Sequence, residues 1–203
     1  MNKSILHLDL DTFFVSVERL LNSELLKKPV LVGGTGNRGV VAACSYETRR
    51  YGIRSGISMK MARQLCPQAI VIRGNAGTYM KYSSLITDII RDSVPLFEKT
   101  SVDEFYVDLT GMDRFFGNYK FATELRKRII NESGLPISFG LSQNKIVSKV
   151  ATGEAKPNNQ LKIDQGFEKS FLAPLPIRKI PMIGKATAQT LIHLGIDKVK
   201  LIQ

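Results

Sequence analysis

Two short stretches of the sequence place carboxylates inside patterns that otherwise predict β-strands. The first is HLDLD, in which His7, Asp9 and Asp11 alternate with leucines. The second is SVDEFYVDL, in which Asp103 and Glu104 stand side by side among apolar residues. Neighbouring residues of a regular strand point to opposite faces. Asp103 and Glu104 can therefore reach one site only if the backbone turns or bulges between them.

The chemistry that these acids favour depends on a metal ion. Burying an unpaired carboxylate is costly unless a cation or a hydrogen-bond donor compensates it. If two strands of one sheet bring Asp9, Asp103 and Glu104 together, their oxygen donors are typical of Mg²⁺ or Mn²⁺ sites. Two such ions can stabilise both oxygens of a phosphoryl or nucleotidyl transfer. Alternatively, Asp9 and Asp11 cap helices, and Asp103 and Glu104 lie in an exposed turn.

The net charge indicates a polyanionic partner. The chain has 203 residues, with 29 Lys and Arg against 18 Asp and Glu, which gives a formal net charge of +11 and a pI near 9.7. An excess of this size favours nucleic acid, and a solvated basic surface is the other explanation. Clustered carboxylates in so basic a protein are not needed for solubility.

The composition predicts a globular, cytoplasmic protein. A hydrophobic share of 43% and a charged share of 23% are ordinary for a folded domain. No run approaches the roughly 18 apolar residues of a membrane span, and Asp9 comes too early for a signal peptide. Cys44 and Cys66 are expected to be free and buried. With only His7 and His193 beside them, a zinc site is not expected.

Hydrophobic periodicity predicts an α+β protein in which strands and helices are mixed. Strands are expected at residues 4–11, 27–34, 69–74, 101–109 and 135–142, and residues 38–50 should pass from a strand into a helix. Helices are expected at residues 12–21, 58–66, 78–94, 120–133 and within 180–196. Asp11 suits the N-cap of the first helix. The polar segment 154–166, which includes AKPNNQ, predicts a loop, with a domain boundary near residue 165.

Six stretches together resemble a known family. They are HLDLDTFFVSVE, KKPVLVGG, RGVVAACSYETRRYGIRSGISMKMARQLCP, SVDEFYVDLTG, ISFGLSQNKIVSKVATGEAKPN and IPMIGKATAQTLIHLGI, in the family's order from residue 5 to about 196. The chain resembles a Y-family, lesion-bypass DNA polymerase, of the branch that includes bacterial DNA polymerase IV. The resemblance implies a palm with a mixed sheet at residues 1–11 and 76–165. It also implies small α/β fingers at 12–75 and a partial helical thumb at 166–203.

The resemblance implies a two-metal catalytic site. Its ligands would be the carboxylates of Asp9, Asp103 and Glu104 and the carbonyl oxygen of Leu10, around two Mg²⁺ ions that Mn²⁺ can replace. The primer 3′-OH would attack the α-phosphate of a dNTP, and pyrophosphate would leave. Asp11 and Asp108 are not metal ligands in the family, and we expect them to be structural.

The resemblance also implies the nucleotide contacts. Phe14 matches the steric gate that excludes a 2′-OH, with Phe13 beside it in the nucleotide site and partly in the core. Tyr46 and Arg49 stand three apart, as on one helix face, and match triphosphate contacts. Lys156 in EAKPN matches a third contact with the same phosphates.

Other positions concern the base pair and the DNA. Val40 and Ala42 match the small residues that roof the nascent base pair, although a tightly packed sheet would explain them equally well. Ala43 stands where the family usually has Thr or Ser. Gly184 and Lys185 match a helix-hairpin-helix of the thumb, which binds a DNA phosphate through backbone N–H groups. Met182 stands where that motif usually has its first glycine.

The expected function is DNA-templated DNA synthesis past damage, with primer–template DNA and dNTPs as partners. The chain ends at Gln203 inside the expected thumb, so we expect a truncated fragment that lacks the little finger and any sliding-clamp motif. Such a fragment should bind DNA weakly and turn over slowly. Two alternatives are another two-metal enzyme, such as a nucleotide cyclase, and a DNA- or dNTP-binding fragment or scaffold without efficient turnover.

Overall fold

The computed structural model describes residues 3–112 and 117–203 and has the α+β architecture that the sequence predicts. The strands are β1 (Ile5–Leu10), β2 (Val30–Gly33), β3 (Val41–Cys44), β4 (Ile70–Ile72), β5 (Phe97–Lys99), β6 (Glu104–Asp108), β7 (Ile137–Ser142) and β8 (Gln160–Lys162). The α-helices are α1 (Phe13–Leu21), α2 (Tyr46–Arg49), α3 (Met59–Leu65), α4 (Ala76–Ser93), α5 (Asn118–Ser133), α6 (Lys145–Ala155), α7 (Glu168–Leu172) and α8 (Lys185–His193). Short 3-10 helices are η1 (Ser23–Leu25), η3 (Ile177–Lys179) and η4 (Val199–Leu201).

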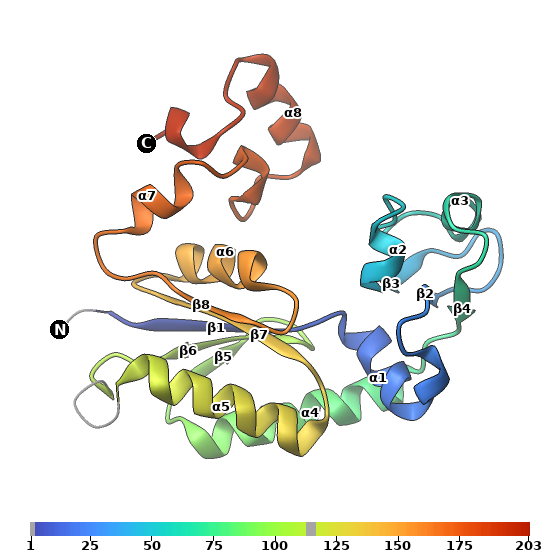
Figure 1. Ribbon diagram of the computed structural model, residues 1–203, viewed down its shortest axis with the longest axis horizontal. Helices are drawn as coiled ribbons and strands as arrows, with labels where there is room; N and C mark the ends of the chain where they lie inside the picture. Colours follow the sequence, from blue (N-terminus) through green and yellow to red (C-terminus); the bar gives the residue numbers. More distant parts are fainter. Residues whose placement is uncertain (1–2, 113–116) are drawn as a thin grey trace.

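Two sheets organise these elements (Figure 1). The larger sheet has the order β5-β6-β1-β7-β8, with β1 antiparallel to β6 and β7, and β7 parallel to β8. The smaller sheet has the order β3-β2-β4 and lies to one side of the larger sheet, together with α2 and α3. The segment that carries α7 and α8 lies above α6 in the same view.

Both faces of the larger sheet are covered by helices. Figure 1 shows α4 and α5 below the sheet and α6 above it. All six residues of β7 are buried, and Leu6, Leu8 and Phe139 are fully inaccessible. A strand buried on both faces loses the simple alternation of apolar and polar residues. His7 is 1% exposed on the α6 side and contacts that helix through a hydrogen bond.

A glycine in the central sheet allows α6 to lie unusually close to β7. A Cβ atom at Gly140 would lie 2.1 Å from the carbonyl oxygen of Ser148 and 2.6 Å from the backbone nitrogen of Thr152. Real Cβ atoms do not approach backbone atoms so closely, so only glycine fits here. The close contact brings the sheet-facing side chains of α6 against β1, which carries Asp9.

The structure corrects several sequence expectations. Helix α6 and the short strands β5 and β8 were not predicted, and β8 lies inside the expected loop at residues 154–166. The N-cap of α1 is Thr12 in the left-handed region (φ 44°, ψ 49°), so the prediction of Asp11 as cap is wrong. Strand β6 begins only at Glu104, and Asp103 lies in a bend before it, as the required turn between the two acids predicts.

The cysteine prediction is confirmed, because Cys44 and Cys66 are both free and buried. In the parts of the chain that the structure describes, no helix is long and apolar enough to cross a membrane.

The hairpin that precedes α8 contains a strained residue. Met182 has a φ of 72°, where a side chain is disfavoured, and it is fully exposed. The neighbouring Gly184 has a φ of −74°, which any residue can adopt.

We expect Met182→Gly to stabilise the protein. Removing a left-handed side chain gains about 1–2 kcal/mol, and the greater freedom of glycine in the unfolded chain costs about 0.5–1 kcal/mol. The net gain in the free energy of unfolding should be about 0.5–1 kcal/mol, measured by urea denaturation. Gly184→Ala is the matched control and should not be destabilising, because a Cβ there meets nothing within 4 Å. A lower midpoint for Met182→Gly would contradict this explanation.

Candidate active site

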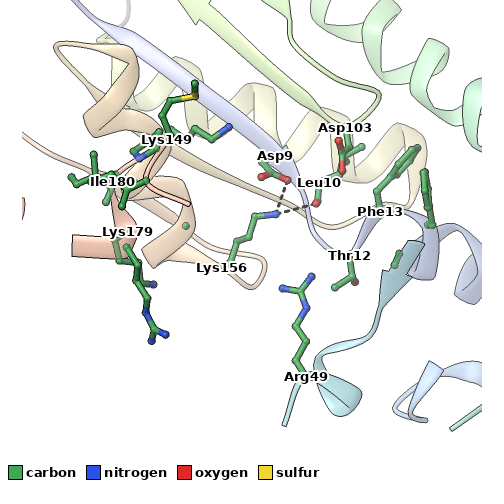
Figure 2. Close-up of a pocket in the computed structure, with 18 of the residues that line it drawn as sticks. Asp9, Leu10, Thr12, Phe13, Arg49, Asp103, Lys149, Lys156, Lys179 and Ile180 are labelled. Carbon is green, nitrogen blue, oxygen red and sulfur yellow. Dashed lines mark hydrogen bonds and ion pairs between the residues drawn. The ribbon is translucent and has the colours of Figure 1, made fainter. Parts of the chain in front are cut away.

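A cavity of about 590 Å³ opens where the larger sheet, the smaller sheet and the C-terminal segment meet. Its walls combine cationic, acidic and aromatic side chains from segments far apart in the chain (Figure 2). The predicted site residues that line it are Asp9, Leu10, Phe13, Phe14, Ala42, Arg49, Asp103 and Lys156. The sequence thus predicted eight of the residues that line the cavity. It missed the side chains contributed by α6 and by the segment around η3.

Asp9 and the carbonyl of Leu10 both point to the ammonium group of Lys156. The Nζ atom of Lys156 donates to Asp9 Oδ1 at 2.6 Å and to the Leu10 carbonyl oxygen at 3.0 Å (Figure 2). The side chain of Lys156 is 18% exposed. Two oxygens that were predicted to bind a metal therefore already converge on one centre of positive charge.

The electrostatics of Asp9 favour further positive charge. Burial raises the pKa of the Asp9 carboxyl above its ordinary value, and the nearby carboxylate of Asp103 raises it further, while Lys156 lowers it. Lys156 thus offsets only part of the cost of burying the Asp9 charge. Together with the hard oxygen donors, this fits a divalent cation held by Asp9, Asp103 and the Leu10 carbonyl.

Glu104 lies beside the cavity and does not line it as the other two acids do. Its Oε1 atom accepts from His7 Nε2 at 2.8 Å and from Lys149 Nζ at 2.5 Å. These two donors lower the pKa of the Glu104 carboxyl to about 2 despite its partial burial. Strand register places Glu104 directly opposite Asp9, so the two carboxylates leave neighbouring strands on the same side of the sheet.

The three predicted acids are near one another but do not form a closed cluster. Asp103 Oδ1 accepts from the hydroxyl of Ser101 at 2.5 Å, within the bend that precedes β6. Among residues 3–112 and 117–203, no group of three or more His, Cys, Asp and Glu side chains is arranged to hold a metal ion. Lysines occupy the positions next to Asp9 and Glu104.

The two lysines that pair with Glu104 and Asp9 lie on one face of the α6 segment. Lys149, Thr152 and Lys156 have the i, i+3, i+7 spacing that places side chains on one helix face. Lys149 bonds to Glu104, Thr152 to His7 and Lys156 to Asp9. Only Lys156 was singled out from the sequence, because α6 itself was not predicted. The spacing could have shown this shared face, had the segment NKIVSKVATGEAK been recognised as helical.

Asp11 is structural, as the resemblance implied. It is 1% exposed, and its carboxylate accepts from Ser138 Oγ at 3.1 and 2.9 Å and from the backbone nitrogen of Asn158 at 2.6 Å. The hydroxyl of Tyr46 also donates to it at 3.2 Å. Burial and the charge of Asp11 raise the pKa of the Tyr46 hydroxyl, which keeps it protonated. Tyr46 is thus engaged with Asp11 and is not among the residues that line the cavity.

Arg49 reaches the cavity from the smaller sheet. Figure 2 shows its guanidinium directed toward the space below Lys156. Its Nε atom is buried without a hydrogen-bond partner among the described residues, and its Cζ atom lies 4.9 Å from the centre of the Tyr46 ring. A buried N–H donor without a partner is costly, which favours an anionic ligand that would accept from it.

Phe14 forms part of an aromatic wall. Its ring stacks on Tyr79, with centroids 4.3 Å apart and planes inclined by 12°. The hydroxyl of Tyr79 donates to Glu18 at 2.5 Å, which fixes the supporting ring. Phe13 is 3% exposed and belongs to the core as well as to the edge of the cavity.

The remaining predicted positions lie around this centre. Ala42 and Phe14 line the main cavity and also a second, more apolar cavity of about 460 Å³. Val40 is 52% exposed and Gly184 is the N-cap of α8, with Lys185 as its first residue. Arg178 and Lys179 line the cavity from the C-terminal side and were not predicted.

Comparisons with known proteins identify the family of the chain. Residues 8–153 match the model of the impB/mucB/samB family, and residues 168–196 match the IMS family HHH motif. The chain is 47% identical over 197 residues to DNA polymerase IV of Dehalococcoides mccartyi and 40% identical over 201 residues to DNA polymerase IV of Treponema denticola. These alignments cover 96% and 98% of the chain but 50% and 51% of those relatives.

Solved structures show the same fold. DinB from Sulfolobus solfataricus aligns with a TM-score of 0.91 at 31% identity, over 98% of this chain and 59% of that one. An insertion ternary complex of Dbh DNA polymerase aligns with a TM-score of 0.88, also at 31% identity, over 98% and 60%. The chain spans about half the length of the curated relatives it matches. The chain therefore belongs to the impB/mucB/samB family, which is the Y-family of DNA polymerases.

Proposed function

We propose that this chain is the catalytic part of a lesion-bypass DNA polymerase that transfers dNMP from a dNTP to a primer 3′-OH. The proposal rests mainly on one observation: Asp9 Oδ1 and the Leu10 carbonyl oxygen converge on one positive charge. The same cavity also contains Arg49, whose buried Nε–H lacks a partner among the described residues and could donate to a phosphate. When bound, two divalent ions would supply charge stabilisation at the attacking and leaving oxygens. Asp9, Asp103, Glu104 and the Leu10 carbonyl would hold them.

The other residues of the cavity would bind and orient the nucleotide. Arg49 and Lys156 would donate to phosphate oxygens, and Tyr46 would do so if it exchanges its bond with Asp11. The stacked ring of Phe14 would lie beneath the deoxyribose, and Ala42 with Val40 would lie over the base pair. Mn²⁺ should replace Mg²⁺, because all the proposed ligands are oxygen atoms.

The proposed function divides the chain into three parts. We assign the palm to residues 1–11 and 76–165, the fingers to 12–75 and the thumb portion to 166–203. Primer–template DNA would lie between fingers and thumb, where Arg178, Lys179 and the α8 N-terminus with Gly184 and Lys185 can meet phosphates. Any sliding-clamp contact would belong to the part of the relatives that this chain does not span.

Primer extension with single dNTPs tests the proposal. At low salt and high protein concentration, the preferred dNTP should be the complement of the template base and should change when that base is changed. Low salt matters because phosphate contacts weaken steeply as salt rises. A nucleotide preference that does not follow the template would overturn the proposal.

Binding without efficient turnover is the second candidate, because Lys156 and Lys149 already pair with the Asp9 and Glu104 carboxylates in the structure. If extension is absent while Mg²⁺-dependent dNTP binding persists, this candidate is favoured. If that binding is absent too, the proposed ligand set is wrong.

The stacked position of Phe14 predicts a specific selectivity defect. We expect Phe14→Ala to lower the preference for dNTP over rNTP by about 5- to 150-fold, because a ring that would clash with a 2′-OH imposes about 1–3 kcal/mol. Relative kcat/KM values for dCTP and CTP measure it. Phe14→Leu should show an intermediate loss, because it retains part of the bulk. Unchanged discrimination in Phe14→Ala would remove the assignment of this residue as steric gate.

A further inference from the structure

His7 is a buried group to which the proposed function assigns no role. Its side chain is 1% exposed, and it precedes Asp9 by two residues on the same face of β1. Both ring nitrogens have partners: Nδ1 lies 2.7 Å from Thr152 Oγ1, and Nε2 lies 2.8 Å from Glu104 Oε1. The ring also lies against Tyr106, with centroids 4.6 Å apart. The imidazole is therefore held on three sides.

The hydrogen-bond partners determine which nitrogen carries a proton toward Glu104. An ionised carboxylate can only accept, so Nε2 must donate to Oε1. The hydroxyl of Thr152 can donate to Nδ1 of a neutral ring. It can also accept from Nδ1 of a charged ring and donate instead to the carbonyl of His7 at 3.0 Å or of Ser148 at 2.9 Å. In either state, the donor that faces Glu104 is the same.

The two oxygens of Glu104 are used unequally. Oε1 accepts from both His7 Nε2 and Lys149 Nζ. Across the described part of the chain, no hydrogen bond reaches Oε2. Lys149 is 39% exposed on a flexible stem, so it fixes the carboxylate less firmly than a buried ring can. The buried imidazole of His7, held by two hydrogen bonds, is therefore the more rigid of the two donors to Glu104.

We propose that His7, supported by Thr152, is a positioning residue that fixes Oε1 of Glu104 and leaves Oε2 available as a ligand for a divalent cation. The inference rests on the proposed function, because it names what orients one ligand of that site. Removing a residue that hydrogen-bonds to a metal ligand typically lowers metal affinity by about 10- to 100-fold.

Mn²⁺ titration followed by electron paramagnetic resonance, without DNA and with or without dATP, tests the proposal. We expect His7→Leu to weaken Mn²⁺ binding by about 10- to 100-fold. His7→Gln should restore most of the affinity, because its amide nitrogen can donate from a position similar to Nε2. Thr152→Val should weaken binding and Thr152→Ser should not. Thr87→Val is the matched control for loss of a buried hydroxyl, since Thr87 lies on α4, which covers the face of the sheet opposite α6 (Figure 1).

Glu104→Gln, measured alongside, separates the two possible failures. If Glu104→Gln weakens Mn²⁺ binding but His7→Leu and Thr152→Val bind as the parent does, the positioning role is wrong and the proposed function stands. If His7→Gln is as weak as His7→Leu, the donor is not the cause, and the inference also fails. If Glu104→Gln itself binds normally, the proposed ligand set is wrong. Should His7→Leu fail to fold in thermal unfolding, the Thr152 pair decides alone.

His7→Leu added to Glu104→Gln provides the final check. The two changes should not be additive, because His7 is proposed to act only through Glu104. Full additivity of their effects on Mn²⁺ binding would overturn the inference.

Discussion

Asp103→Ala/Glu104→Ala should abolish template-directed extension while leaving the fold in place. Removing a single electrostatic stabiliser of a transition state costs about 10²- to 10³-fold in rate, so the loss of two proposed metal ligands should cost at least about 10³-fold. Asp103 lies in a bend before β6, and Glu104 is the first residue of that strand. Neither side chain is part of the apolar core. The expected result is therefore a catalytic defect with little change in far-UV circular dichroism.

Asp108→Asn is the matched control for this double variant. Asp108 lies on the same strand, and its Oδ1 atom accepts from the backbone nitrogen of Thr110 at 2.9 Å. Asparagine can accept that bond as well, so extension should be nearly normal. Single-turnover extension rates at saturating dNTP and Mg²⁺ measure both proteins. Extension by the double variant within tenfold of the parent, on the order of 1.4 kcal/mol, would rule out the two acids as catalytic ligands.

Lys156→Ala should change two binding constants in opposite directions. In the structure, the ammonium group occupies the point at which Asp9 Oδ1 and the Leu10 carbonyl converge. Removing it frees both oxygens, so we expect the variant to bind Mn²⁺ alone more tightly. A hydrogen bond to a charged group contributes about 1.5–3 kcal/mol, which sets the gain at about 10- to 150-fold.

The same variant should bind a dNTP more weakly in the presence of Mn²⁺. Lys156 is proposed to donate to the phosphates, and the loss of a charge-assisted bond should cost about tenfold or more. Calorimetric titrations with Mn²⁺ alone and with Mn²⁺ and dATP together measure the two constants. Lys162→Ala is the control, because Lys162 forms an exposed pair with Asp164 at 2.6 Å on an edge strand. Parallel changes of both constants would show that Lys156 does not move between the carboxylate and the phosphates.

Part of the site was predictable because it depends on short sequence patterns. HLDLD reads as a strand that ends in acids, and SVDEFYVDL reads as a strand with two acids near its start. The need for a turn between Asp103 and Glu104 follows from strand geometry alone. The bend at Asp103 and the pairing of Asp9 with Glu104 agree with that reasoning. The free, buried state of Cys44 and Cys66 followed equally from composition.

Other elements could not be predicted from periodicity. Strands β5 and β8 have three residues each, and their place in the sheet depends on pairing with β6 and β7 rather than on their own sequence. The N-cap of α1 was assigned to Asp11 because aspartate is a common cap. In the fold, Asp11 instead satisfies the buried donors of Ser138 and Asn158, which lie 127 and 147 residues away.

Residue types and short-range spacing were enough to predict the acids, the aromatic pair at Phe13 and Phe14 and the basic character of the chain. Which lysine pairs with which acid is evident only in the folded chain. The lysine-bearing face of α6 meets β1 because Gly140 lets the helix approach the sheet, and the resulting bonds join residues about 145 positions apart. No local pattern specifies such pairings, since they depend on packing between elements that the chain brings together only when it folds.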